Sequence, residues 1–239
     1  MIDKAKDIRK GEELDLIKLT EYLGDHLTGF SGNLEVSQFP SGFSNLTYLI
    51  KTGQKEYVLR RPPFGANIKG GHDMHREFRV LSALKPVYSK VPKPVLFCDN
   101  HSVMGADFYL MERVKGVILR SQAPKDIELK PELMRSISEA CIDTLADLHT
   151  MDLTAAGLAD FGRPEGYTQR QVEGWIGRYY KSETDKLPHM DVVAEWLQKH
   201  IPEQKYVSFI HNDYKYNNLV LNPEKLDEII AVLDWEMST

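Results

Sequence analysis

Residues 211–236 read HNDYKYNNLVLNPEKLDEIIAVLDWE and combine polar residues with two short apolar runs, LVL and AVL. Turn residues separate the runs, so they predict an antiparallel pair of strands. With Leu219 opposite Leu233, Asn218 and Asp234 leave the pair at the same end. An amide oxygen and a carboxylate that converge in this way suit a hard cation such as Mg²⁺, which keeps water and phosphate oxygens as its other ligands. We therefore predict that Asn218 and Asp234 are metal ligands.

The loop before the first of these strands supplies groups for phosphoryl transfer. Asp213 can accept or orient a hydroxyl proton, and the nearby Lys215 can place positive charge against a transferring phosphoryl group. Phosphoryl transfer requires mainly positioning and charge neutralisation, which these residue types supply. One alternative makes His211 and Asp213 metal ligands of a hydrolase, but the further ligands at helix or strand spacing are absent from the sequence. Another is that these residues are solvated loop residues.

Several stretches of the sequence resemble a known family. HNDYKYNN resembles the kinase catalytic loop H-x-D-x-x-x-x-N, and LDWE resembles the motif of the metal-binding Asp in kinase-like folds. Trp-Glu follows Asp234 where protein kinases have Phe-Gly, which is closer to the aminoglycoside phosphotransferase and choline kinase-like family. YVLRRPP, FYLMERVKG, LADLH, RQVEGWIGRYY and VLDWEMST are similar to kinase-like domains found alone or fused to acyl-CoA dehydrogenases. In this resemblance His211 braces the catalytic loop.

The resemblance implies a two-lobed, protein-kinase-like α+β fold. Residues 1–114 are expected to form an N-terminal antiparallel sheet lobe that binds the nucleotide. Residues 115–239 are expected to form a mainly helical lobe with the catalytic loop and the metal-binding hairpin. Family members continue beyond the DWE motif through helices that complete this lobe. We therefore expect these C-terminal helices to be missing from the chain and its turnover to be weak or absent.

The resemblance also implies the reaction, in which the γ-phosphoryl group of ATP moves to a hydroxyl of a small molecule with the help of Mg²⁺. The resemblance to domains fused with acyl-CoA dehydrogenases makes a hydroxylated acyl compound the expected acceptor. An aminoglycoside is less expected, because it is polycationic and requires a cluster of acidic residues, which in this family comes largely from the missing C-terminal end. A fusion or functional link to an acyl-CoA dehydrogenase is expected on the same ground. The main alternative is a non-catalytic nucleotide-binding module or an inactive fragment of such a kinase. A protein kinase is a weaker alternative, because nothing after DWEMST can form an activation segment.

The rest of the sequence predicts the elements of the two lobes. Residues 12–29 predict a helix on the outside of the first lobe. The stretches LEVSQF, TYLIK, EYVLR, PVLFC and FYLMERV predict strands, and HDMHREFRVLSAL predicts a helix between the third and the fourth. The turn signals between the strands include DNHSVMG. Residues 131–149, YTQRQVEGWIGRYYKSE and MDVVAEWLQKH predict the helices of the second lobe.

The segment FPSGFSNLTYLI occupies the position of the phosphate-covering loop between two strands. It has one glycine, Gly42, rather than a glycine-rich signature, and a simple hairpin loop would have the same sequence pattern. Ser44 and Asn45 could add donors toward the β- or γ-phosphate oxygens.

The third predicted strand carries Arg60 at the position where kinase-like folds have a phosphate-binding Lys. The helix that follows offers Glu77 as its ion-pair partner. A guanidinium is always charged and binds phosphate in bidentate fashion, so Arg60 can bind phosphate in place of the usual Lys. Arg61 is expected to point away from the cleft as a surface charge, because side chains alternate along a strand.

FYLMERVKG resembles the hinge between the lobes. The resemblance implies that backbone groups of Glu112 and Val114 bind the adenine edge and that Met111 lies behind the ring. Without the other motifs, the same residues would describe an ordinary edge strand.

Composition excludes several classes of partner. The net charge of −5 and the lack of any Lys/Arg-rich block argue against nucleic acid or an anionic membrane surface. No apolar run is long enough to span a membrane, and no N-terminal signal is recognisable. Cys98 and Cys141 lie in apolar contexts without metal-binding spacing, so we predict two buried thiols in a reducing cytoplasm.

Overall fold

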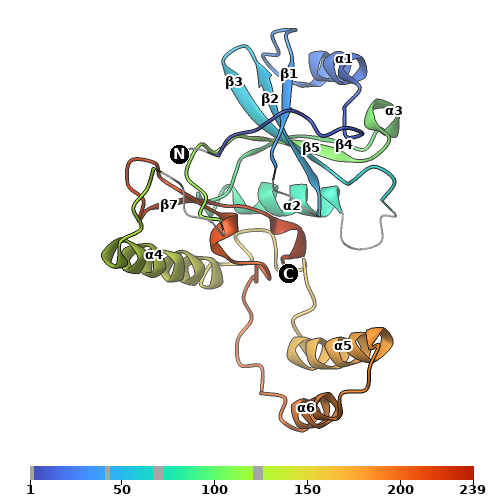
Figure 1. Ribbon diagram of the computed structural model, residues 1–239, viewed down its shortest axis with the longest axis vertical. Coiled ribbons are helices and arrows are strands. Elements are labelled where there is room, and N and C mark those ends of the chain that lie inside the picture. Colours follow the sequence, from blue (N-terminus) through green and yellow to red (C-terminus); the bar gives the residue numbers. More distant parts are fainter. Residues whose placement is uncertain (1–2, 41–43, 67–72, 121–125) are drawn as a thin grey trace.

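The computed structural model describes residues 3–40, 44–66, 73–120 and 126–239. Its upper part in Figure 1 is a five-stranded antiparallel sheet with the strand order β1-β2-β3-β5-β4. The strands are β1 (Glu35–Gln38), β2 (Leu46–Thr52), β3 (Lys55–Arg61), β4 (Pro94–Cys98) and β5 (Phe108–Glu112). The five strands predicted from the sequence are therefore confirmed.

Helices cover both faces of this sheet. α1 (Leu16–His26) and the short α3 (His101–Met104) share a core with one face, to which Leu59 contributes. α2 (Met74–Leu84) shares a core with the other face, to which Val58 contributes. Because side chains alternate along β3, Arg60 points to the same side as Val58, toward α2 and the second lobe. The side chain of Arg60 therefore points from the sheet into the space between the lobes.

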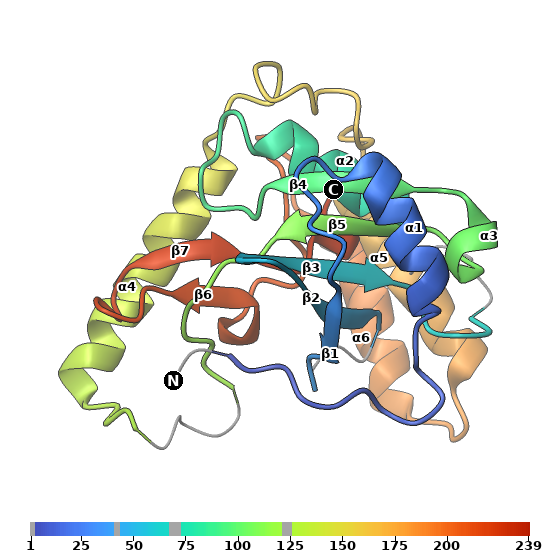
Figure 2. The same ribbon diagram turned by 90° about the horizontal axis from the view of Figure 1, so that it is seen from above.

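The second lobe begins where the chain leaves β5 and crosses to a small hairpin. Val117 pairs with Leu221 in an isolated bridge, and the backbone of Gly116 passes close to the hairpin. A Cβ on Gly116 would lie 2.4 Å from the carbonyl oxygen of Leu221, so only glycine fits there. The hairpin packs against a long helix (Figure 2). These elements are β6 (Leu219–Leu221), β7 (Ile229–Val232) and α4 (Pro131–His149).

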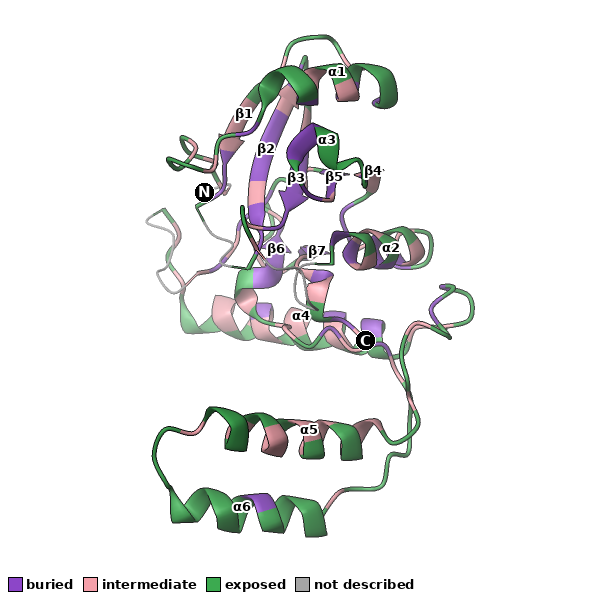
Figure 3. Ribbon diagram, turned by 90° about the vertical axis from the view of Figure 1, so that its right-hand side faces the viewer, coloured by how far each residue is buried: buried purple, intermediate pink, exposed green. Residues whose placement is uncertain are grey.

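Two further helices extend away from the body of the molecule. α5 (Tyr167–Ser182) and α6 (Pro188–Lys199) pack against each other and are mostly exposed, as Figure 3 shows. Trp175 and Trp196 are 63% and 56% exposed, although both belong to apolar positions of amphipathic helices. The second lobe therefore carries an apolar surface that the described residues leave uncovered.

The structure corrects four details of the sequence prediction. Leu219 pairs with Val232 rather than with Leu233, and the hairpin has a register shift between Val220 and Leu221. The predicted turn DNHSVMG contains α3, which is capped by the side chain of Asn100. Arg61 is buried rather than a surface charge, and its guanidinium lies over the Phe64 ring at 3.7 Å. Both cysteines are free, but only Cys98 is buried, while Cys141 is half-buried.

Helices of membrane-spanning length and apolarity do not occur in the part of the chain that the structure describes.

Candidate active site

Arg60 is the centre of a buried charge cluster between the lobes. Its Nη1 donates to Glu77 Oε1 at 2.7 Å, and its Nη2 donates to Asp234 Oδ1 at 2.8 Å. The same Nη2 lies 3.6 Å from Glu236 Oε2. Burial alone lowers the pKa of Arg60, but the charges of Glu77 and Asp234 raise it well above its ordinary value. One permanently charged guanidinium therefore links β3, α2 and the segment after β7.

Glu77 connects this cluster to the backbone of the second lobe. The side chain is 1% exposed, and its Oε1 also accepts the N–H of Trp235 at 3.2 Å. Burial raises the pKa of Glu77 to about 7 despite the attraction of Arg60, and the negative charges of Asp234 and Glu236 contribute to the rise. The sequence prediction of an Arg60–Glu77 ion pair is thus met by the geometry, with additional carboxylates around it.

The backbone is strained at two positions around this site. Asn212 has φ 63° and Asp234 has φ 69°, and they are the only non-glycine residues with positive φ among those described. The left-handed backbone conformation costs free energy in residues other than glycine, and residues in this conformation are found preferentially at functional sites. The Asn212 side chain donates to the carbonyl of Met237 at 2.9 Å, which joins the two strained segments.

The catalytic-loop candidates are held in one hydrogen-bonded group. Asp213 Oδ2 accepts from Asn218 Nδ2 at 2.9 Å and from Lys215 Nζ at 2.8 Å. The Asn218 amide also donates to the backbone carbonyl of Asp213 at 2.9 Å. The hydrogen bond to Asp213 raises the pKa of Lys215, whose side chain is 52% exposed. Asp213 Oδ1 and the ammonium group are therefore placed to meet a ligand.

His211 braces this loop from behind. It is buried, its Nε2 lies 2.9 Å from the carbonyl oxygen of Leu233, and its Nδ1 lies 3.2 Å from the N–H of Asp213. The carbonyl requires a donor and the N–H requires an acceptor, so the neutral ring with the proton on Nε2 satisfies both contacts. Burial lowers the pKa of His211, which keeps the ring neutral. The alternative of His211 as a metal ligand has no support in this geometry, because both ring nitrogens are occupied.

Asn218 and Asp234 fit a hard divalent cation. The N–H of Leu233 donates to the carbonyl of Asn218 at 2.8 Å, so Asp234 follows directly beside Asn218, and both side chains line the same cleft. The amide nitrogen of Asn218 is engaged by Asp213, which leaves its oxygen for a cation. Among the described residues, no group of three or more His, Cys, Asp or Glu forms a metal cluster, so the remaining ligands would be water and phosphate oxygens.

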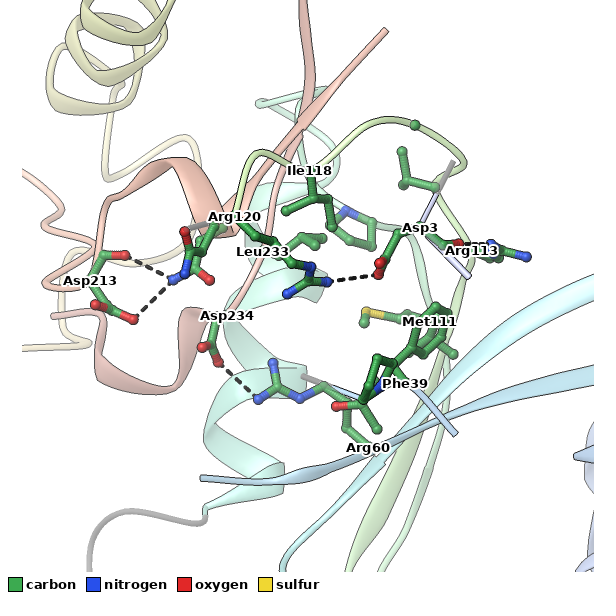
Figure 4. Close-up of a pocket in the computed structure, with 18 of the residues that line it drawn as sticks. Asp3, Phe39, Arg60, Met111, Arg113, Ile118, Arg120, Asp213, Leu233 and Asp234 are labelled. Atoms are coloured by element: carbon green, nitrogen blue, oxygen red, sulfur yellow. Dashed lines mark hydrogen bonds and ion pairs between the residues drawn. The ribbon is translucent and has the colours of Figure 1, made fainter. Parts of the chain in front are cut away.

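These groups lie in one cleft of about 470 Å³, shown in Figure 4. Val58 and Leu233 contribute apolar lining from the two lobes, and Met111 contributes from β5. Glu112 and Val114 line the edge of the cleft where the chain leaves the sheet. The N–H of Glu112 already donates to the carbonyl of Lys93 at 2.8 Å, so its own carbonyl is the group left for a ligand.

The loop that the sequence predicts to cover the phosphates contacts the same charge cluster. Asn45 is buried, and its side-chain amide donates to Glu236 Oε2, while Ser44 is exposed and lines the cleft. Burial raises the pKa of Glu236, and repulsion from Asp234 acts in the same direction. The donors expected to face phosphate are therefore directed in part toward a carboxylate. Gly42, the other predicted residue of this loop, lies outside the described residues.

Sequence reasoning missed Glu236, which joins the charge cluster around Arg60, and the pair of Asp3 and Arg120, which lines the cleft. Glu236 was signalled by its place in DWE, two positions after the proposed metal ligand. Asp3 and Arg120 form an ion pair at 3.0 Å, and nothing in the local sequence indicates that they meet.

A sheet lobe, a helical lobe and this cluster in the cleft between them define a kinase-like phosphotransferase. The chain belongs to the phosphotransferase enzyme family (APH), which it matches over residues 35–239. The family resemblance stated from the sequence is thereby confirmed.

The similar curated proteins carry the names of acyl-CoA dehydrogenases. The chain is 38% identical to acyl-CoA dehydrogenase family member 11 of Rattus norvegicus over 232 residues, which is 95% of the chain and 29% of that protein. It is 36% identical to acyl-CoA dehydrogenase family member 10 of Mus musculus over 239 residues, 100% of the chain and 22% of that protein. The chain thus spans less than a third of the length of these relatives.

Solved structures confirm the two-lobed fold. A crystal structure from Ralstonia eutropha JMP134, described as a candidate aminoglycoside phosphotransferase, matches with a TM-score of 0.81 and 37% identity. The match covers 95% of the chain and 66% of that protein. The ternary complex of streptomycin, ATP and APH(2″)-IIa matches with a TM-score of 0.61 at 18% identity, over 95% of the chain and 72% of that protein. The latter likeness concerns the fold alone.

Proposed function

We propose that the chain is the nucleotide-binding and catalytic part of a small-molecule kinase, which transfers the γ-phosphoryl group of ATP to a hydroxyl. The convergence of the Arg60–Glu77 pair, Asp234 and the Asp213–Asn218 pair on one cleft carries this proposal. Phosphoryl transfer depends on positioning and on neutralising charge, and this cleft offers cations, oxygen ligands and a carboxylate in the required combination. Residues 1–114 and 115–239 are the corresponding lobes in this proposal.

Asp213 is the residue proposed to act on the acceptor. Its Oδ2 is held by Asn218 and Lys215, so the carboxylate has a fixed orientation, and Oδ1 can accept the proton of the acceptor hydroxyl. Lys215 remains half exposed beside it and can place its charge against the phosphoryl oxygens. His211 keeps the loop in this conformation without exchanging a proton with the substrate.

The other end of the proposed reaction is the nucleotide phosphate. Asn218 and Asp234 would hold Mg²⁺, which supplies charge neutralisation of the phosphate oxygens when it is bound. Arg60 is directed to the phosphates by the carboxylate of Glu77. Gly42, Ser44 and Asn45 are proposed to cover the phosphates from the sheet lobe.

The hinge favours adenine in this proposal. The carbonyl of Glu112 accepts the exocyclic amino group, and the N–H of Val114 donates to the ring, with Met111 behind it. Guanine would place a carbonyl oxygen against the carbonyl of Glu112, and the N–H of Glu112 cannot compensate because Lys93 already occupies it.

The acceptor is proposed to be a hydroxylated acyl compound. The relatives named as acyl-CoA dehydrogenase family members 11 and 10 support this choice over an aminoglycoside. They also support a fusion or functional link of the kinase-like part to an acyl-CoA dehydrogenase.

Two substitutions in the natural full-length protein test the assigned roles. Asp213→Asn should reduce phosphoryl transfer at least a thousandfold and leave the affinity for Mg-ATP within about twofold, because Asp213 acts on the acceptor. Asp234→Ala should weaken Mg-ATP binding itself, because a metal ligand is lost. Calorimetric titration and a phosphate-transfer assay measure both effects. Equal loss of nucleotide affinity in the two variants would refute the division of roles, and binding without transfer by the unmodified protein would favour a non-catalytic module.

A further inference from the structure

The first residues of the described chain form an extended segment, residues 3–12, which we call the N-terminal strap. Figure 1 shows it in dark blue, crossing the sheet lobe from the N-terminus. Lys6 and Gln38 exchange two backbone hydrogen bonds of 2.8 Å, which attach the strap to the edge of β1. The N–H of Arg9 donates to the Gln38 side chain at 2.9 Å. The strap is therefore fixed to the sheet independently of its first residue.

Asp3 fastens the strap to the hinge end of the cleft. Its N–H donates to the carbonyl of Gly116 at 3.2 Å, and its carbonyl accepts from Arg113 Nη2 at 2.6 Å. Its carboxylate Oδ2 accepts from Arg120 Nη2 at 3.0 Å. Figure 4 shows the side chains of Asp3 and Arg120 directed toward each other at the cleft that Met111 also lines.

The second oxygen of this carboxylate is available to a ligand. Oδ1 of Asp3 accepts no hydrogen bond from any residue that the structure describes, and the side chain is 23% exposed. Arg113 is paired with Glu56 at 2.6 Å, so the nearest other guanidinium is already balanced. A carboxylate that one guanidinium orients and that faces a cleft suits a hydroxyl donor, because it can only accept.

The position of Asp3 in the cleft points to the sugar of a nucleotide. The hinge residues Glu112 and Val114 would bind the base, whereas Arg60 and Asp234 would bind the phosphates. The sugar of a bound nucleotide would then lie between these groups, in the cleft that Asp3 also lines. We propose that Asp3 accepts a hydrogen bond from a ribose hydroxyl and that Arg120 is the positioning residue for its carboxylate. This inference rests on the proposed nucleotide site.

The test compares ATP with its 2′-deoxy and 3′-deoxy analogues, each with Mg²⁺, by calorimetric titration of the full-length protein. The unmodified protein should bind ATP about tenfold more tightly than the analogue that lacks the contacted hydroxyl, since a hydrogen bond to a charged group is lost. Asp3→Ala should abolish this preference by weakening ATP and leaving the analogue unchanged. Arg120→Gln should reduce the preference to about threefold. Asp7→Ala, which removes an exposed carboxylate of the same strap, is the matched control.

The outcomes separate this inference from the proposed function. If the unmodified protein binds ATP and both analogues equally, or if Asp3→Ala keeps the preference, the ribose contact is refuted while the nucleotide site stands. If the unmodified protein binds no Mg-ATP, the proposed nucleotide site itself fails. Asp3→Asn preserves the shape of the side chain, and its thermal unfolding compared with that of Asp7→Ala shows whether the strap remains folded. A preference that is weakened in a folded Asp3→Asn supports the contact, and an unchanged preference there contradicts it.

Discussion

The buried carboxyl group of Glu77 should make stability depend on pH in a direction opposite to that of an exposed salt bridge. Its pKa is raised from an ordinary value of 4.5 to about 7, because burial outweighs the attraction of Arg60. The folded state therefore holds this proton more tightly than the unfolded state. The resulting stabilisation is complete below pH 4.5 and is lost as the pH rises through about 7.

The size of the effect follows from the two pKa values. A rise from 4.5 to about 7 corresponds to about 3 kcal/mol, since each tenfold change in proton affinity is worth about 1.4 kcal/mol. Glu77→Gln resembles the protonated side chain and keeps an oxygen that can accept from Arg60 and from the N–H of Trp235. We therefore expect the variant to match the unmodified protein near pH 4.5 and to exceed its stability by about 3 kcal/mol near pH 8.

Urea unfolding at fixed ionic strength from pH 4.5 to pH 8 measures this difference, with the slopes of the transitions compared to confirm a common mechanism. Glu139→Gln, at an exposed position of α4, is the control that changes charge without a buried partner. Parallel stability curves for Glu77→Gln and the unmodified protein would refute the reasoning. They would mean that Arg60 keeps Glu77 ionised over the whole range.

Two other substitutions test the hinge and the loop brace by the same method. Gly116→Ala should lower the free energy of unfolding by about 3 kcal/mol, because the new Cβ meets the Leu221 carbonyl at 2.4 Å. Gly177→Ala in α5 has open space around it and should instead raise stability by about 1 kcal/mol. If both variants lose a similar amount of stability, the steric explanation is wrong.

Burial lowers the pKa of His211 below its ordinary value of 6.5, so stability should fall as the pH drops below 6.5 and the unfolded state takes up the proton. His211→Gln keeps a donor for the carbonyl of Leu233 and should remove this loss of stability at low pH. If the variant loses as much stability below pH 6.5 as the unmodified protein, His211 is not the cause of the loss.

Local patterns in the sequence predicted the five strands of the sheet, the longer helices and part of the site. Alternation along β3 places Arg60 and Arg61 on opposite faces, whereas the resemblance to kinase-like folds identified Glu77 of α2 as the partner of Arg60. The spacing of the catalytic-loop motif identified Asp213 and Asn218 as site residues, and the structure joins the two by a hydrogen bond of 2.9 Å. Side-chain alternation along a strand is short-range geometry, which a sequence specifies directly.

Features that depend on distant pairings could not be predicted in this way. The hairpin pairs Leu219 with Val232 and has a register shift between Val220 and Leu221, and no residue type in the strands marks either feature. Glu236 meets Asn45 across 191 positions, and Asp3 meets Arg120 across 117 positions. Arg61 was expected at the surface, but α1 and the segment before it cover that face of the sheet. Such contacts follow from how the elements pack, which local periodicity does not determine.

The guanidinium at position 60 matches the set of carboxylates that surrounds it. Arg60 uses Nη1 for Glu77 on α2 and Nη2 for Asp234 after β7, so two nitrogen atoms of one rigid plane span the two lobes. A Lys ammonium carries all its donors on one nitrogen atom, whereas the guanidinium presents two separate nitrogen atoms to the two carboxylates. The planar group thus positions Asp234, the proposed metal ligand, while it stays paired with Glu77 in the sheet lobe. Because Trp235 donates its N–H to the same Glu77 oxygen, the conformation of the DWE segment depends on the pair as well. The Arg60–Glu77 pair therefore connects β3, α2 and the DWE segment.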